Sequence, residues 1–187
     1  SVADMTAATT RASTAVDKIA EDHFAAEMAL SPISATHQGI PGGDHRLDDF
    51  TPDGFAALSE LRRATLGRLE EATPVDDVDA VTVAAMRERL GLAEEIHATG
   101  LDEMECNVLA SPMQHVRSVF DLMPTDTDAQ WATLGERLTR VPEALGQWVD
   151  TLAGAAATGQ VTQRRQVRAC IGQCEQFTSD GGYFAGL

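Results

Sequence analysis

Helical periodicity runs through nearly the whole chain, and it is the feature that most restricts the possible folds. Apolar residues recur every three or four positions, whereas alternating segments and β-branched clusters of strand length are missing. In the segment 51–74, for example, the recurring apolar residues are Phe55, Leu58, Leu61, Leu66 and Leu69. The sequence therefore predicts an all-α fold, a multi-helix bundle of about seven helices with short connections and antiparallel neighbours.

Three of the predicted helices begin with Ser or Thr followed by Pro. Ser31, Thr51 and Ser111 each place a capping side chain before a proline at the first helical position. After the third of these starts, Gln114 can reach back to the amide of Ser111, as in a capping box. Further helices are expected over 14–30, 76–100, 125–141 and 142–159, and from Thr162 onward.

The same periodicity predicts which side chains face the core. In the helix 14–30, the predicted buried residues are Val16, Ile19, Ala20, Phe24 and Met28. In the helix that runs toward Gly100, they are Val78, Val81, Ala85, Leu92 and Ile96.

The segment 40–50 is predicted to be an acidic Gly/Pro loop, because it contains Pro, two Gly and three Asp. With 187 residues the chain is long enough to bury a core of its own. Residues 1–187 are therefore expected to form either a single helical domain or the N-terminal half of a larger helical domain. The apolar C-terminal segment 179–187 indicates a docked tail or a chain cut within a domain, and we favour the cut.

Charge and composition argue against several classes of partner. The chain has 29 acidic and 14 basic residues, and its formal net charge of -15 would repel a phosphate backbone. We therefore expect neither nucleic acid nor a membrane as partner, and no apolar run reaches the roughly 18 residues that span a bilayer. The three cysteines form no disulfide framework, which fits a reducing, cytoplasmic location.

No complete metal-binding motif is present in the sequence. A helical zinc hydrolase needs H-E-x-x-H, which places two imidazoles on one metal, and this chain lacks that pattern. His23 and Glu27 lie one helical turn apart and could supply two ligands, but no third is evident. We therefore interpret His23 as a partly buried helix histidine, and we expect no metal or cofactor in this chain.

The cysteines are also interpreted as structural. Cys170 and Cys174 share an apolar helix face, which favours core packing over half of a zinc site. The acidic neighbours Glu103 and Glu105 are expected to raise the pKa of Cys106 rather than activate its thiol as a nucleophile.

The predicted helix 112–123 is apolar over most of its circumference. Its narrow polar stripe consists of Gln114, Arg117, Ser118 and Asp121. Arg117 and Asp121, one turn apart, form either a local ion pair or a patch that faces a cleft, and the ion pair is the simpler expectation. His115 lies on the apolar side and is expected to be a hydrogen-bonded core residue rather than a catalytic one.

Three segments, 31–52, 107–131 and 137–167, occur in an order that resembles a known family. Over residues 17–184 the chain is similar to the N-terminal part of the bacterial family called domain of unknown function 885. The resemblance implies a longer protein whose later part carries an H-E-x-x-x-G-H-H type motif, as in helical zinc metallopeptidases. No position in this chain matches that motif, so no zinc ligand or catalytic residue is carried over.

The resemblance implies that the chain is the N-terminal, non-catalytic helical part of a zinc-dependent peptidase-like hydrolase. Its helices are expected to form one wall of a substrate cleft, with zinc only in the full-length protein and no activity in this chain alone. The candidate substrate-binding residues are Asn107, His115 and Arg117, and the fork of Arg117 suits a carboxylate.

The expected partners are the remainder of a longer polypeptide and a peptide or carboxylate-bearing small substrate. The alternative is a stand-alone helical interaction or scaffolding module without catalysis.

Overall fold

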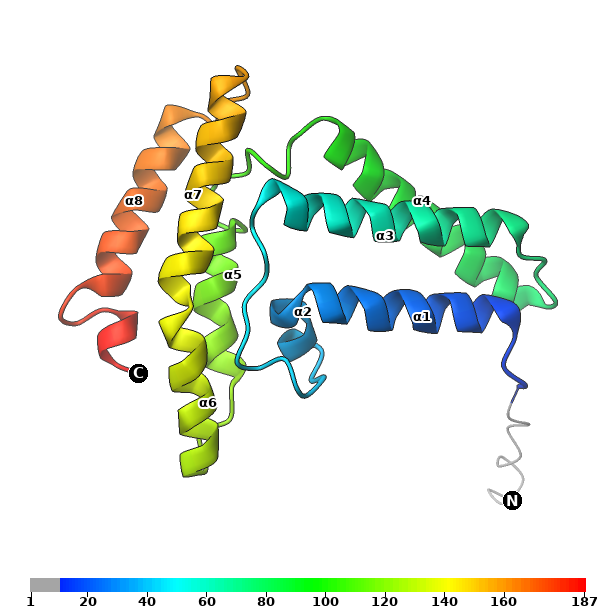
Figure 1. Cartoon of the computed structure of the whole chain (residues 1–187), viewed down its shortest axis with the longest axis horizontal. Helices are drawn as coiled ribbons and strands as arrows, with labels where there is room; N and C mark the ends of the chain where they lie inside the picture. Colours follow the sequence, from blue (N-terminus) through cyan, green and yellow to red (C-terminus); the bar gives the residue numbers. More distant parts are fainter. Residues whose placement is uncertain (1–10) are drawn as a thin grey trace, which may run out of the picture.

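The computed structural model describes residues 11–187, and it consists of helices joined by turns and loops (Figure 1). No strand occurs within this range, so the predicted all-α class is confirmed. The helices are α1 (Ala15–Leu30), α2 (Pro32–His37), α3 (Pro52–Glu71), α4 (Asp77–Ala98), α5 (Pro112–Ser118), η1 (Val119–Leu122), α6 (Asp128–Thr139), α7 (Val141–Ala157), α8 (Arg164–Thr178) and η2 (Tyr183–Ala185). None of these helices combines the length and apolar character that a bilayer crossing requires.

The predicted helix starts are confirmed. Ser31 and Thr51 precede α2 and α3, and their side chains accept hydrogen bonds from the amides of Ser34 and Gly54. At the start of α5, the Gln114 Oε1 accepts a hydrogen bond of 2.8 Å from the amide of Ser111. These contacts satisfy amides that the first turn of a helix leaves without partners, which is why the sequence marks these positions well.

The helices α1, α3 and α4 lie side by side and form the first of two groups in the fold (Figure 1). Their small core consists of Val16, Ile19, Leu69 and Val83. Near this core the fully buried carboxylate of Asp79 accepts hydrogen bonds from Thr14 Oγ1 (2.8 Å) and the amide of Val75 (3.0 Å). Arg11 also forms an ion pair with Asp79, so this buried charge is compensated.

Part of the predicted core face is wrong in this group. In α4, Val78, Val81, Leu92 and Ile96 are exposed, and Val83 and Asp79 are buried instead. The reason is that α4 carries apolar residues on two sides, so its periodicity does not indicate which side meets α1 and α3. In α1, likewise, Phe24 is exposed and its neighbour His23 is buried.

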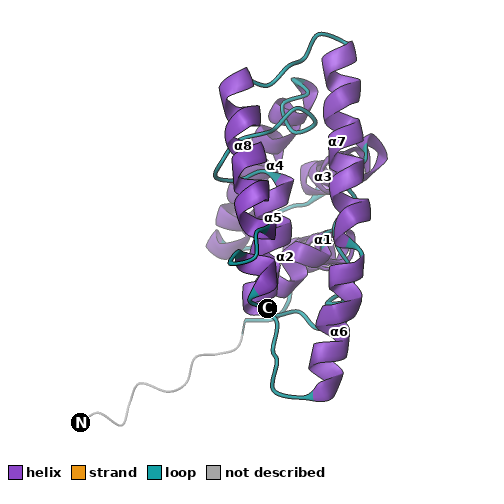
Figure 2. Cartoon of the chain, turned by 90° about the vertical axis from the view of Figure 1, so that its left-hand side faces the viewer, coloured by secondary structure: helices purple, strands orange, loops and turns teal. Residues whose placement is uncertain are grey.

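The second group contains α5 to α8, and in both views α6 continues the line of α7 (Figure 1 and Figure 2). The two helices meet at Arg140, two residues before Pro142 and close to the boundary that the sequence predicted. The core of this group is the larger of the two, and it also takes in Ile33 and Phe50 from the N-terminal half. Its largest side chain, Trp148, donates from Nε1 to the carbonyl of Glu105 at 3.3 Å.

The segment 40–50 is non-helical, as predicted, and a buried arginine ties it to α6. Arg137 is fully buried and donates from Nε to the carbonyl of Arg46 at 2.7 Å. Its Nη2 donates to the carbonyl of Pro32 (3.2 Å) and to Thr36 Oγ1 (3.0 Å). Arg137 therefore holds α2 and the loop against the second group of helices. A second long connection, residues 99–111, was not anticipated.

The aromatic C-terminal residues are docked on the second group of helices, which is one of the two interpretations of this segment. The ring of Phe184 meets that of Phe120 edge to face, with 6.1 Å between their centroids. Gly182 permits the turn from α8 into η2, because a Cβ atom there would lie 2.2 Å from the carbonyl oxygen of Gln176. This docking creates one wall of the cavity described next.

Candidate functional site

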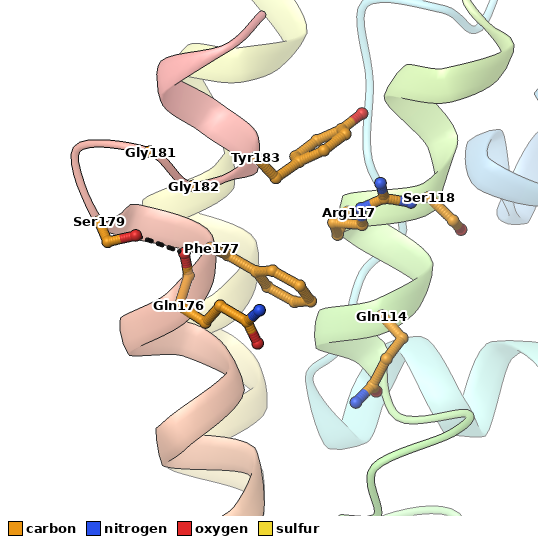
Figure 3. A pocket seen from close by; sticks show the side chains of 9 residues that line it. All are labelled: Gln114, Arg117, Ser118, Gln176, Phe177, Ser179, Gly181, Gly182 and Tyr183. Carbon is orange, nitrogen blue, oxygen red and sulfur yellow. Dashed lines mark hydrogen bonds between the residues drawn. The ribbon is translucent and has the colours of Figure 1, made fainter.

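A cavity of ≈ 650 Å³ lies between α5 and the C-terminal part of α8 with η2 (Figure 3). From α8 and η2, Phe177 and Tyr183 point toward Arg117 and Gln114 on α5. The complete lining is Gln114, Arg117, Ser118, Gln176, Phe177, Ser179, Gly181, Gly182 and Tyr183. The cavity thus combines one guanidinium with amide, hydroxyl and aromatic groups.

Arg117 is held in this cavity by two residues from different elements. Its Nη1 donates to the carboxylate of Asp121 in η1, one turn further along the chain. Its guanidinium carbon lies 3.8 Å from the centroid of the Tyr183 ring, in a cation–π arrangement. The Tyr183 hydroxyl in turn donates to Asp121 Oδ1 at 2.9 Å, so the three side chains form a closed group.

The protonation state of Tyr183 is consistent with this donor role. Burial, and secondarily the hydrogen bond to Asp121, raise the pKa of Tyr183 to about 12. The hydroxyl therefore keeps its proton at neutral pH and shares the carboxylate of Asp121 with Arg117. Among the described residues only Asp121 accepts a hydrogen bond from Arg117, and it takes a single donor nitrogen. The guanidinium thus keeps donors for an anionic group.

The other polar side chains of the cavity are engaged locally. Ser118 donates to the carbonyl of His115 (3.2 Å), and Ser179 donates to that of Gln176 (2.9 Å). Both acceptors are backbone carbonyls, so neither hydroxyl is hydrogen-bonded to an imidazole or carboxylate side chain that could act as a base. The arrangement is therefore suited to binding an anion rather than to nucleophilic chemistry.

Of the three candidate substrate-binding residues, Arg117 alone lines this cavity. Asn107 instead shapes the turn before α5, where its Oδ1 accepts hydrogen bonds from the amides of Leu109 (2.8 Å) and Ala110 (2.9 Å). His115 is exposed on α5 rather than in the core. The structure therefore does not bring the three residues together, and a binding role for Asn107 and His115 stays a prediction.

The closed group includes a residue that the sequence did not single out. Tyr183 was noted only as part of an apolar tail, and nothing in the spacing connects it with Arg117. The turn at Gly181 and Gly182 was the available signal, because consecutive glycines permit a close backbone approach after a helix. Asp121 was identified on the polar stripe, and its predicted ion pair with Arg117 is confirmed.

In the part of the chain that the structure describes, no three side chains of His, Cys, Asp or Glu are placed to hold a metal ion. His23 is buried, and its Nδ1 lies 2.9 Å from Thr65 Oγ1, while its Nε2 lies 3.8 Å from Glu27. The residue is thus a hydrogen-bonded helix histidine, as interpreted from the sequence.

The three cysteines have free thiols, and Cys106 and Cys170 are buried. Burial raises the pKa of Cys106 to about 12, and the neighbouring Cys170 adds to the shift. The predicted upward shift of the Cys106 pKa is confirmed, but its cause differs. The sequence suggested the acidic neighbours Glu103 and Glu105, whereas burial and the Cys170 thiol raise the pKa in the structure. Cys106 and Cys170 belong to the larger hydrophobic core, and Cys174 packs against it, so the packing interpretation is confirmed.

Fold and cavity together define an all-α protein with an arginine-containing site between α5 and α8. A family model described as "Bacterial protein of unknown function (DUF885)" matches residues 32–184. Because the match covers most of the chain, the protein belongs to this family, and the resemblance seen in the sequence is confirmed to that extent. No curated protein matches the chain.

Proposed function

We propose that this chain is the N-terminal, non-catalytic helical part of a zinc-dependent peptidase-like hydrolase. In this proposal the cavity between α5 and α8 forms part of one wall of the substrate cleft. Arg117 binds a carboxylate of the substrate, which is a peptide or another carboxylate-bearing small molecule. The observation that carries the binding role is the placement of Arg117, which Asp121 and Tyr183 hold at a cavity of ≈ 650 Å³.

The catalytic part of the proposal is supported by the family resemblance alone. Zinc would supply a Lewis acid for amide hydrolysis, and its ligands would come from sequence outside this chain. The described residues contain no cluster of side chains that fits such an ion, so the proposal assigns them substrate binding and no part in the hydrolysis itself. The free thiols support a cytoplasmic location for the protein.

The catalytic part is tested on the gene and on the full-length protein. We expect an open reading frame that continues beyond Leu187 to an H-E-x-x-x-G-H-H type motif, and zinc bound in a one-to-one ratio to the purified protein. A reading frame that stops at Leu187, or a full-length protein that binds no zinc, would contradict the peptidase role.

The binding role is tested by Arg117→Ala in the full-length protein. Hydrogen bonds to charged groups contribute about 1.5–3 kcal/mol, so KM for carboxylate-bearing peptides should rise by about tenfold to a hundredfold, with kcat nearly unchanged. The matched control is Arg140→Ala, because Arg140 also pairs with a carboxylate one turn away, Glu136, but lies outside this cavity. Equal KM values for the two variants would exclude a substrate contact at Arg117.

One observation favours the alternative, a helical interaction module without catalysis. The exposed face of α4 carries Val78, Val81, Leu92 and Ile96 in one stripe, and apolar surface of this kind is typical of contact regions. This alternative requires no carboxylate binding at Arg117, so the same pair of arginine variants separates the two functions.

A further inference from the structure

A second cavity, of ≈ 520 Å³, shares the lining residue Phe177 with the Arg117 cavity. Its walls are almost entirely apolar, and include Met113, Val116, Leu138, Val141, Leu145 and Phe184. The one hydroxyl in its lining belongs to Thr178, and it donates to the carbonyl of Cys174 at 2.9 Å. The cavity is therefore suited to an apolar group and offers no free donor to a polar one.

The same three elements form walls of both cavities. From α5, Arg117 lines the first cavity and the preceding Val116 lines the second. From η2, Tyr183 lines the first and the following Phe184 lines the second. The Phe177 side chain on α8 belongs to both. Residues that are consecutive in the sequence thus line different cavities. The guanidinium of Arg117 in the first cavity is therefore close to the apolar lining of the second.

We propose that the two cavities form one bipartite site, whose ligand is a carboxylate with an extended apolar substituent. The carboxylate binds Arg117, and the substituent passes Phe177 into the second cavity. An N-acylated amino acid or a peptide end with a long aliphatic side chain has this chemistry. The inference rests on the proposed function for the carboxylate contact, and it adds the apolar half that selects among carboxylates.

The test is a binding series on the purified chain with N-acetyl amino acids of increasing side-chain length, each compared with its neutral amide. Glycine, alanine, aminobutyrate, norvaline and norleucine derivatives add one carbon at a time. Because a buried methylene contributes about 0.8 kcal/mol, affinity for the acids should rise by about fourfold per carbon. Arg117→Ala should reduce each acid to the affinity of its amide.

A variant pair tests the second cavity separately. Ala185→Trp places a large ring at the rim of this cavity, at an exposed position, and should abolish the dependence on chain length. Ala157→Trp is the matched control, because Ala157 is also exposed but lines neither cavity. If Ala185→Trp loses its helical circular dichroism, Val141→Thr is used instead. This substitution places a hydroxyl in the lining of the second cavity at nearly constant side-chain volume, and it should weaken the dependence on chain length.

The outcomes separate the inference from the function on which it rests. Acids that bind through Arg117 with the same affinity at every chain length would overturn the bipartite site and leave the proposed carboxylate contact intact. If no acid binds in an Arg117-dependent way, the proposed contact is wrong, and the inference falls with it. Chain-length dependence that survives Ala185→Trp would also overturn the inference.

Discussion

Arg137 contributes to stability in a way that its surface neighbour Arg140 does not. Arg137 is fully buried and donates to two carbonyls and a hydroxyl, while its Nη1 has no partner among the described residues. Arg137→Ala should lower the free energy of unfolding by about 3 kcal/mol, because it leaves these buried acceptors unpaired. Arg140→Ala should cost less than about 0.5 kcal/mol, since its ion pair is exposed. Urea denaturation measures both, and equal losses would contradict this role of Arg137.

His23 gives the stability a pH dependence. Burial lowers the pKa of His23, so the folded state resists protonation more than the unfolded state does. Its contribution to stability is thus complete above the unfolded value of about 6.5 and is lost as the pH falls below it. His23→Gln cannot titrate and should flatten the unfolding free energy between about pH 6.5 and pH 5. A wild-type slope in His23→Gln would refute the assignment.

The position of η2 depends on Gly182, and a second glycine, Gly172, serves as a control for the ordinary effect of Gly→Ala on helix propensity. In Gly182→Ala, the new Cβ would meet two backbone carbonyls, at 2.2 Å and 2.7 Å, so η2 should detach and stability should fall by about 1–3 kcal/mol. Gly172→Ala lies within α8 in open space and should instead add about 0.5–1 kcal/mol. Amide hydrogen exchange over residues 179–187 should accelerate only in the first variant. Unchanged protection there would mean that the turn tolerates a side chain.

The positions of the helices could be predicted well from the sequence, whereas the side that each helix buries could be predicted less well. The starts at Ser31, Thr51 and Ser111 were predictable because a capping side chain acts within one turn of its own chain. The buried side of α4 was not, because Val81 and Val83 are both apolar and only the position of α1 and α3 decides between them. The burial of Asp79 needs Arg11, which is distant in the sequence, so no local pattern indicated it.

At the scale of the whole molecule, the candidate site is formed by residues that only the fold brings together. The ion pair of Arg117 with Asp121 could be predicted, since one helical turn separates the two residues. The stacking on Tyr183 could not be predicted, because it requires α8 and η2 to return alongside α5. Asn107 and His115 are near Arg117 in sequence, yet the turn before α5 and the exposed side of that helix place them outside the cavity.

The most direct test of the central claim, that Arg117 binds a carboxylate in the cavity between α5 and α8, is a nuclear magnetic resonance titration of the chain with N-acetylnorleucine. We expect the largest shifts at the Arg117 side chain and at the amides of Gly181, Gly182 and Tyr183, and no such shifts with the neutral amide or in Arg117→Ala. Saturating shifts elsewhere in the chain, or identical shifts with acid and amide, would contradict the account.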